Sequence, residues 1–385
     1  MSFKNQCLFC KKKITPIINL GKLPPSDYFA PNFLLAKNAK SYKLEVGRCK
    51  NCSLVQNINI ISAKRRYQDI QYIYNSANSN FAKKHWSDYT KVLSEYFKPN
   101  IKVLDIGCND GYLLNLIKNK TKSKFIYGID ASPFQIKFSR KKYKNINFNC
   151  GYGENLKKIY NKNYFDLITC NNVLNHSSNP VSFLKEVNYV LKKDGKLIIE
   201  VPNWINTVKD KSWDQIYHEH VTYFTPFTIS KILLAAGLNP FKIKDTKYHG
   251  GSLRVFVDKK KLQLLINQQD TSYIQCKSLF MQAEIRKKRA KKIIDQLKNK
   301  NIYLFGAPAK GNTLVNYFGL NNKQIIAALE TSKNKIGKFF PKACIPIINE
   351  DKIFSKNSYL INLNWNIPFV FNKFCKLKKI KKLII

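Results

Sequence analysis

Acidic residues are scarce in this sequence. Its 385 residues include 24 Asp and Glu against 67 Lys and Arg, which gives a formal net charge of +43. Such a field favours polyanions, including nucleic acids and anionic membrane surfaces. The lysines are nevertheless spread along the whole chain and accompany many Asn, Ile, Tyr and Phe residues, which indicates a compositional bias. We therefore expect no nucleic-acid partner, although a small anionic substrate would benefit from the positive field.

Long apolar runs are also missing. No run approaches the roughly 18 to 20 residues of a membrane-spanning helix, and the first residues lack the apolar centre of a signal peptide. We expect a cytoplasmic protein without membrane association. Ten cysteines in such a chain argue against a disulfide framework. The length allows two or three domains.

Four of the cysteines form two C-x-x-C pairs, Cys7 with Cys10 and Cys49 with Cys52. Each pair can turn two thiolates toward one point, and two pairs complete a tetrahedral four-sulfur site. The alternative is a set of redox-active or unmetallated thiols. We predict structural zinc, because a closed four-sulfur site leaves no open position for catalysis.

The middle of the chain alternates short β-rich runs with helical patterns. Between two of these runs, residues 180–195 place apolar side chains on one helical face, with Gly195 where the helix is expected to stop. The expected strands are KVLDI, FIYGID, FDLITC and KLIIEV. Strands that alternate with helices predict an α/β protein with a mainly parallel, doubly wound sheet of the Rossmann-like class.

A second α/β pattern follows a long, lysine-rich segment. Residues 262–300 are expected to form a helix that joins two units, and residues 301–318 repeat the sequence of strand, Gly-rich turn and helix. Further strands are expected in IIAALET and SYLINLN. The predicted domains are residues 1–66, 67–250 and 251–385.

The segment from Asp105 to Gly111 follows an expected strand and opens a helix. Gly107 and Gly111 let the backbone approach a ligand, and Asp130, at the end of the next strand, can hydrogen-bond two ribose hydroxyls. Asn109 replaces the middle glycine of a dinucleotide fingerprint, which argues against NAD. This set favours S-adenosylmethionine (SAM), whereas an ordinary strand-to-helix turn is the alternative.

Polar residues gather in two further segments. Asn171 and His176 follow the strand FDLITC, at the edge of the sheet where side chains face a ligand crevice, and we expect Asn171 to contact the cofactor. Residues 217–220, Tyr-His-Glu-His, combine a phenol, a carboxylate and two imidazoles. Histidine is well suited to general base work near neutral pH. The alternative is a metal site or a buried polar network, although the H-E-x-x-H spacing is absent.

Two Gly-rich segments offer candidate substrate contacts. His249-Gly-Gly-Ser-Leu-Arg254 allows close backbone approach, and Arg254 could clamp a phosphate. The turn from Gly306 to Thr313 contains Lys310 and Asn312 but lacks the Gly-Lys-Ser/Thr ending of a triphosphatase loop. A purely structural turn is an equal alternative for both segments.

In this order the motifs resemble the sugar C-methyltransferase family of deoxysugar biosynthesis. Its members methylate C3 of thymidine-diphosphate-linked 4-keto-deoxysugars. The resemblance covers nearly the whole chain and includes the segments 72–79, 309–313 and 364–366. It implies an N-terminal zinc-binding domain, a central SAM-dependent methyltransferase domain and a C-terminal Rossmann-like domain, with a nucleotide-linked sugar as substrate.

This chain departs from the family pattern in several places. Asn75 and Ala77 replace other small or polar residues, and Glu330 stands at a strand end where the family often has Asp. The last residues, KLKKIKKLII, lack the expected Gly or Pro. We therefore expect the last strand to be missing or altered.

The resemblance also implies a mechanism, because methylating a carbon requires a carbanion. In this hypothesis His220 removes the C3 proton of the keto-sugar, and the enolate attacks the sulfonium methyl group. Glu219 and Tyr217 would position the base or the sugar, and His176 would polarise the ketone oxygen.

Tyr74, with Tyr72 as its substitute, is expected to complete the site from its N-terminal edge. Two other functions stay open at this point. The first is methylation of an oxygen or nitrogen, for which one base suffices. The second is a basic, nucleic-acid-binding zinc protein with a vestigial methyltransferase fold.

Overall fold

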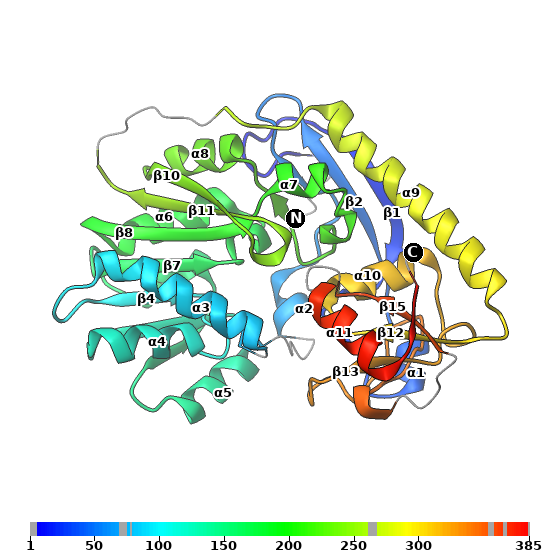
Figure 1. Ribbon diagram of the computed structural model, residues 1–385. Coiled ribbons are helices and arrows are strands. Elements are labelled where there is room, and N and C mark those ends of the chain that lie inside the picture. Colours follow the sequence, from blue (N-terminus) through cyan, green and yellow to red (C-terminus); the bar gives the residue numbers. More distant parts are fainter. Residues whose placement is uncertain are drawn as a thin grey trace.

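The computed structural model describes residues 6–68, 75–77, 79–260, 268–352, 358–364 and 368–383, with the exception of the His249 side chain. Tyr72 and Tyr74, and residues 365–366 of the last motif, lie outside this part. The described residues form three sheets, one in each region of the chain (Figure 1). The α/β class with a parallel Rossmann-like sheet is confirmed.

The N-terminal region forms a four-stranded antiparallel sheet in the order β1-β2-β3-β9. Its last strand, β9, comes from the central region and directly follows the Tyr-His-Glu-His segment. That segment is therefore held against the N-terminal sheet. The strands are β1 (Ile14–Leu23), β2 (Tyr42–Cys49), β3 (Val55–Asn57) and β9 (Thr222–Tyr223), and the helices are α1 (Phe33–Lys37) and α2 (Ala63–Tyr67).

The central sheet has seven strands in the order β10-β11-β8-β7-β4-β5-β6. Strands β4 to β8 are parallel to their neighbours, and the β10-β11 hairpin adds two antiparallel strands beyond β8. The strands are β4 (Val103–Ile106), β5 (Ile126–Asp130), β6 (Asn147–Cys150), β7 (Phe165–Asn171), β8 (Leu191–Pro202), β10 (Asn239–Thr246) and β11 (Ser252–Asp258). The sheet thus continues past residue 250, where the sequence places the second domain boundary, and the two boundaries stay predictions.

Helices accompany the central sheet, and short 3-10 helices connect several of its elements. The α-helices are α3 (Asn80–Leu93), α4 (Tyr112–Thr121), α5 (Pro133–Lys142), α6 (Pro180–Val190), α7 (Trp204–Lys209) and α8 (Pro226–Ala235). The 3-10 helices are η1 (Ser94–Tyr96), η2 (Gly153–Lys158), η3 (Leu174–His176), η4 (Trp213–Gln215) and η5 (Tyr248–Gly250).

Helix α6 shows how the local sequence produces this arrangement. The Asn179 side chain caps its first turn, Pro180 follows at the first helical position, and the apolar stripe is buried. The predicted end at Gly195 is wrong. Leu191 already has extended backbone and pairs with Phe165 of β7, so strand β8 begins directly after the helix.

The C-terminal region forms a parallel five-stranded sheet in the order β14-β13-β12-β15-β16. Its strands are β12 (Asn301–Phe305), β13 (Ala327–Glu330), β14 (Ile347–Asn349), β15 (Ser358–Asn362) and β16 (Lys381–Leu383), and its helices are α10 (Ala309–Phe318), η6 (Glu350–Lys352) and α11 (Pro368–Lys378). The last strand was predicted from the sequence to be missing or altered, and the structure differs from this prediction. Strand β16 is present and pairs in parallel with β15.

The predicted joining helix is α9 (Tyr273–Gln296), which begins at a capping box formed by Ser272 and Gln275. Figure 1 shows it lying along the N-terminal strand β1. One hydrophobic cluster contains Val46 of the N-terminal sheet, Leu279 of α9 and Leu304 of β12. A second cluster joins the N-terminal residues Leu8 and Leu54 to the central sheet. The N-terminal region thus contributes to the packing of both other regions.

None of the helices in the described ranges combines the length and apolar composition that a bilayer crossing requires. This finding agrees with the absence of long apolar runs from the sequence.

A buried amide joins the C-terminal region to the N-terminal one. The Asn312 side chain on α10 donates to the carbonyl oxygens of Pro25, Ser26 and Tyr28, at 3.2, 3.0 and 3.2 Å. The Ser26 hydroxyl lies 2.7 Å from the Thr313 hydroxyl. Asn312 was predicted to contact the substrate, and its amide NH2 instead holds the loop that follows β1.

Removing this amide provides a test of domain docking. Asn312→Ala leaves three carbonyl oxygens without their donor, and an unsatisfied buried polar group costs about 1–3 kcal/mol. We expect a lower midpoint of thermal unfolding than in the wild-type protein. The exposed Asn322 on the same region provides the control, because Asn322→Ala should leave the midpoint unchanged. An equal effect of both substitutions would contradict the docking role.

Candidate active site

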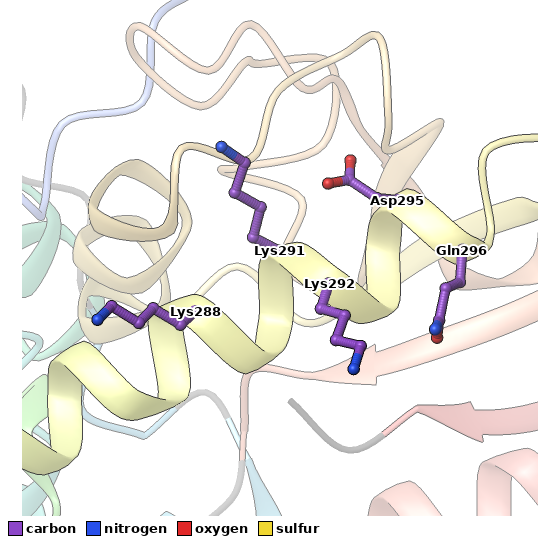
Figure 2. Close-up of a pocket in the computed structure, with 5 residues that line it drawn as sticks. All are labelled: Lys288, Lys291, Lys292, Asp295 and Gln296. Carbon is purple, nitrogen blue, oxygen red and sulfur yellow. The ribbon is translucent and has the colours of Figure 1, made fainter.

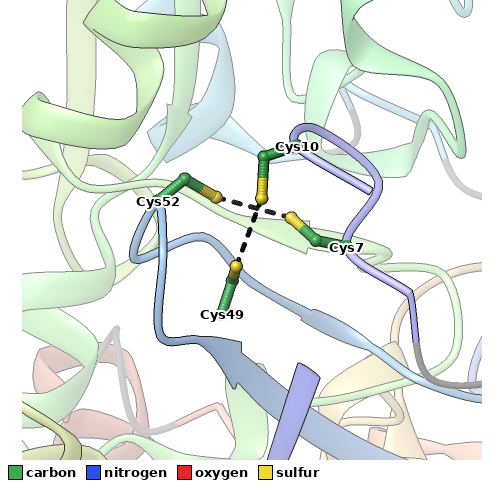
Figure 3. Close-up of side chains that lie close together, drawn as sticks. All are labelled: Cys7, Cys10, Cys49 and Cys52. Atoms are coloured by element: carbon green, nitrogen blue, oxygen red, sulfur yellow. Dashed lines mark hydrogen bonds between the residues drawn. The ribbon is translucent and has the colours of Figure 1, made fainter. Parts of the chain in front are cut away.

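The four predicted metal ligands meet at one point (Figure 3). Their Sγ atoms all lie within 4.8 Å of one another, with Cys7 3.4 Å from Cys52 and Cys10 3.4 Å from Cys49. Zinc binds four thiolates tetrahedrally at about 2.3 Å, and a sphere of that radius fits these separations. The expectation of a four-cysteine site is confirmed. Cys7, Cys49 and Cys52 are buried, which suits a structural metal.

The proposed cofactor crevice lies at the carboxyl ends of β4, β5 and β7. Asp130 ends β5, and its two carboxylate oxygens accept backbone N–H groups of Asn109 and Ser132, at 3.0 and 2.9 Å. A carboxylate has about four acceptor positions, so two remain for ribose hydroxyls. Burial raises the pKa of Asp130 to about 6. The residue is therefore mostly ionised at neutral pH.

Asp105 and the two glycines shape the turn after β4. Asp105 accepts a 2.6 Å hydrogen bond from the Thr169 hydroxyl, and burial raises its pKa to about 7. Gly107 has φ +73°, and a Cβ atom there would lie 2.1 Å from Val173. Gly111 has φ +74° and initiates α4. Glycine is therefore required at both positions for conformational reasons, whatever the ligand.

The crevice is bordered by a segment from the predicted family motif. The backbone N–H of Ser76 donates to Asn109, and its hydroxyl donates to Asp110 at 2.7 Å. Asn171 lies at the end of β7, where it pairs with Glu200 of β8. Its position matches the expectation of a cofactor contact, which remains a prediction.

Tyr217 and His220 form a hydrogen-bonded pair. The Tyr217 hydroxyl lies 2.6 Å from His220 Nε2, and His220 Nδ1 lies 2.9 Å from the Gln215 carbonyl oxygen. A carbonyl oxygen can only accept, so we place the ring proton on Nδ1. The lone pair of the neutral imidazole is then on Nε2, where it accepts the Tyr217 hydroxyl proton.

His176 lies beside this pair, with its ring 5.3 Å from the His220 ring. Its Nδ1 is hydrogen-bonded to the Tyr67 hydroxyl. Burial holds the pKa of His176 well below its usual value, and the nearby His220 and Arg66 lower it further. His176 is therefore neutral at physiological pH.

Arg66 connects the two histidine-bearing segments. Its side chain is buried, with 2% of its surface exposed. The guanidinium donates to the carbonyl oxygens of Ile61, His176 and Glu219, at 3.0, 3.1 and 3.3 Å. Sequence reasoning missed both Arg66 and Tyr67. Neither belongs to a motif, and only the fold of α2 brings them to the site.

Glu219 is buried and faces the N-terminal loop. Its Oε1 accepts the backbone N–H groups of Ser26 and Asp27, at 3.1 and 3.3 Å. Burial raises its pKa, whereas these donors and Arg66 favour the ionised form. The predicted cluster of Tyr217, Glu219 and His220 is thus held by residues from outside the central region.

Two other residues complete this description. The His218 ring lies 3.1 Å from the Tyr42 carbonyl oxygen through Nε2, and burial lowers its pKa to about 4. Asn175 in η3 is buried, and its amide has no hydrogen-bond partner among the described residues. A buried amide without a partner indicates a bound ligand or water. Asn175 was not singled out from the sequence. The signal that could have identified it is its position next to the predicted site residue His176.

The predicted substrate contacts Arg254 and Lys310 lie on different elements, β11 and α10. Arg254 on β11 forms a 2.8 Å ion pair with the fully buried Glu200, and its guanidinium lies 4.5 Å from the Tyr89 ring. This pairing argues against the predicted phosphate clamp, because the buried carboxylate already neutralises the guanidinium. Lys310 is half-buried, and burial lowers its pKa. The His249 side chain lies outside the described residues.

An open hollow elsewhere on the surface carries mostly positive charge (Figure 2). It lies on the outer side of α9, and none of the residues described above lines it. Its lining residues are Lys288, Lys291, Lys292, Asp295 and Gln296. Its lining contains none of the predicted catalytic residues.

Three family matches follow one another along the chain. Residues 7–67 match the family described as "Putative zinc binding domain", residues 97–248 match "Methyltransferase domain", and residues 247–373 match "C-methyltransferase C-terminal domain". The fold and the central match define a SAM-dependent methyltransferase domain of the Rossmann-like class. The two flanking matches add a zinc-binding region before it and a C-methyltransferase C-terminal region after it.

Individual relatives match part of the chain. C-methyltransferase NovU of Streptomyces niveus is 26% identical over 198 residues, which cover 48% of this chain and 47% of NovU. A tRNA U34 carboxymethyltransferase of Sulfurimonas denitrificans is 33% identical over 182 residues, 41% of this chain and 59% of that protein. The chain thus spans about half the length of the curated relatives it matches. A solved structure, that of a SAM dependent methyltransferase from Aquifex aeolicus, aligns with 44% of this chain over 88% of its own length. The aligned residues are 24% identical, and the TM-score is 0.37.

The cysteine cluster predicts about one tightly bound zinc per chain. Cys49→Ser should release the metal and lower the thermal stability of the N-terminal region, because structural zinc contributes directly to folding. Metal analysis and thermal unfolding measure both effects. Cys150→Ser provides the control, because Cys150 is exposed and stands outside the cluster. Purified wild-type protein without zinc would contradict the prediction.

The position of Asp130 predicts a contact with the cofactor ribose. Asp130→Asn should weaken binding of S-adenosylhomocysteine by roughly 1–3 kcal/mol in calorimetry, because an ionised acceptor is lost. Wild-type affinity should fall as the pH drops below about 6, where Asp130 gains a proton. The difference between wild type and variant should therefore narrow at low pH. If wild type and Asp130→Asn bound S-adenosylhomocysteine equally well at neutral pH, Asp130 would not contact the cofactor.

Proposed function

We propose that this protein transfers the methyl group of SAM to a carbon of a nucleotide-linked 4-keto-deoxysugar, at C3. The observation that carries the proposal is the cluster of His220, Tyr217, His176 and Glu219 at the edge of a methyltransferase domain. Methylation of carbon needs a base, a group that stabilises an enolate and a fixed geometry. The cluster supplies residues for each task.

His220 is the proposed base. Its Nδ1–H is held by the Gln215 carbonyl, so the basic lone pair is on Nε2. In the structure this lone pair accepts the Tyr217 hydroxyl. When the sugar binds, Tyr217 moves its hydrogen bond to the substrate, and Nε2 takes the proton from C3. The imidazolium that forms is carried by the residue next to the buried Glu219 in the chain.

His176 is the proposed electrophile for the ketone oxygen. With the Tyr67 hydroxyl as donor to Nδ1, the ring proton of neutral His176 is on Nε2. Nε2–H can then donate a hydrogen bond to the oxygen on which the enolate charge develops. The low pKa of His176 keeps it neutral, so it acts by hydrogen bonding without giving up a full proton.

The cofactor site completes the proposal. Bound SAM would supply an electrophilic methyl group, and Asp105, Asp130 and Asn171 are the residues proposed to hold it. Gly107 and Gly111 shape the turn that borders it. No metal is required for this chemistry, so the zinc site is assigned to structure.

The sugar substrate rests on the resemblance of the whole chain and on the requirement for an acidic carbon. A keto group acidifies the neighbouring C–H bond, whereas an oxygen or nitrogen acceptor would not need the second histidine. The net charge of +43 also favours an anionic substrate such as a nucleotide diphosphate. We propose neither a nucleic-acid nor a membrane partner.

Hydrogen exchange tests the base. In the presence of S-adenosylhomocysteine, which lacks the methyl group, wild-type protein should exchange the C3 hydrogen of a 4-keto nucleotide sugar with solvent deuterium. His220→Asn should lose this exchange and methyl transfer while keeping normal affinity for S-adenosylhomocysteine. His218→Asn is the matched control, because the His218 ring is directed to the Tyr42 carbonyl. Full methyl transfer to the keto-sugar by His220→Asn would contradict the mechanism, and surviving exchange would move the base role to another residue.

A further inference from the structure

A second acidic residue, Asp27, contacts Glu219 through its backbone N–H, and neither the motifs nor the proposed mechanism use it. Asp27 lies in the loop Pro24 to Tyr28 that follows β1. The backbone N–H groups of Ser26 and Asp27 both donate to Glu219 Oε1. Two acidic residues from different regions of the chain therefore meet in one partly buried space.

The C-terminal region holds this loop in place. The Asn312 amide donates to the carbonyl oxygens on both sides of Asp27, and the Ser26 hydroxyl contacts Thr313. Asp27 is thus held in position by the hydrogen bonds that its two neighbours in the chain, Ser26 and Tyr28, accept from Asn312. All three regions of the protein take part, because the loop comes from the first, Glu219 from the second and Asn312 from the third.

The charged and titratable groups around Asp27 come from three other elements. Glu219 and Tyr217 lie in the turn before β9, Tyr67 ends α2, and Lys335 follows β13. Burial, together with the charge of Glu219, raises the pKa of Asp27 to about 7, and Lys335 acts in the opposite direction. Lys335 also donates to the Ala307 carbonyl at 2.8 Å.

The two carboxyl groups differ in their hydrogen bonds. Glu219 accepts backbone N–H groups, and such donors stabilise a carboxylate over a carboxylic acid. Two like charges in a shared buried site cannot both form without a large energetic penalty. The negative charge of the pair therefore belongs on Glu219, and the proton belongs on Asp27.

We propose that Asp27 is a positioning residue of the methyl-transfer site, which holds the proton of a carboxyl pair and so keeps a single negative charge on Glu219. This role rests on the proposed function. One negative charge stabilises the His220 imidazolium that forms when the C3 proton is taken. A second charge, on Asp27, would repel the enolate and the anionic substrate, so the rate should fall as Asp27 ionises.

Infrared difference spectroscopy of the full-length, zinc-loaded protein tests the shared proton without substrate. Between pH 6 and 8, chosen on either side of the Asp27 pKa of about 7, wild type should lose the buried carboxylic-acid bands of Asp27 and of Asp105, because burial also raises the pKa of Asp105 to about 7. Asp27→Asn should lose the Asp105 band without the Asp27 band, and the exposed Asp210→Asn should lose both. Glu219→Gln should move the Asp27 transition to lower pH, because the like charge is gone. If Asp27→Asn fails to fold, the Glu219→Gln variant still tests whether the two carboxyl groups share one proton.

The pH profile of C3 hydrogen exchange tests the role in the reaction. The wild-type rate should fall several-fold above neutral pH, and Asp27→Asn should keep its rate there. Ser26→Ala, which perturbs the same loop without changing a charge, should retain the wild-type fall. A carboxylic-acid loss that keeps its full wild-type amplitude in Asp27→Asn, or an Asp27 transition that stays at the same pH in Glu219→Gln, would overturn the proposal. The predicted infrared results in a protein without exchange activity would uphold the carboxyl pair and contradict the proposed function instead.

Discussion

The buried guanidinium of Arg66 is the interaction on which the candidate site depends. It is 2% exposed and donates to the carbonyl oxygens of His176 and Glu219, which belong to separate segments of the central region. Hydrogen bonds from a charged donor are stronger than neutral ones, and the loss of this buried guanidinium would remove a donor from three carbonyl groups, those of Ile61, His176 and Glu219. Arg66 is carried by α2, directly after the zinc-binding part of the chain. The N-terminal region therefore connects, through Arg66, the two segments that carry His176 and Glu219.

Much of the architecture could be predicted because it depends on local patterns. Alternating apolar runs and helical stripes gave the central and C-terminal sheets, and C-x-x-C spacing gave the four-sulfur site, since two such pairs have few other uses. Asp130 could be assigned to a strand end because an acidic residue closes an apolar run. Residues 217–220 could be singled out because histidine is rare in this chain, with five in 385 residues. The roles of these residues in catalysis remain predictions.

The remaining features depend on contacts between distant segments, which no local pattern encodes. Asp27 and Arg66 carry no motif, and only the folded N-terminal region brings them to Glu219. Arg254 was expected to clamp a phosphate, but the pairing of β11 with β8 places it opposite Glu200, where a buried carboxylate neutralises it. Asn312 likewise satisfies backbone carbonyls across a domain boundary. In both cases a polar side chain that looked available in the sequence is used to satisfy a buried group.

The central claim is that the methyl group reaches a carbon. The most direct test incubates the protein with SAM labelled in its methyl group and a panel of 4-keto nucleotide sugars, and then locates the label by NMR spectroscopy. The account predicts a new carbon–carbon bond at C3, next to the ketone, with at least one member of the panel. Label on an oxygen or nitrogen atom, or label at a carbon that is not acidified by a ketone, would contradict it.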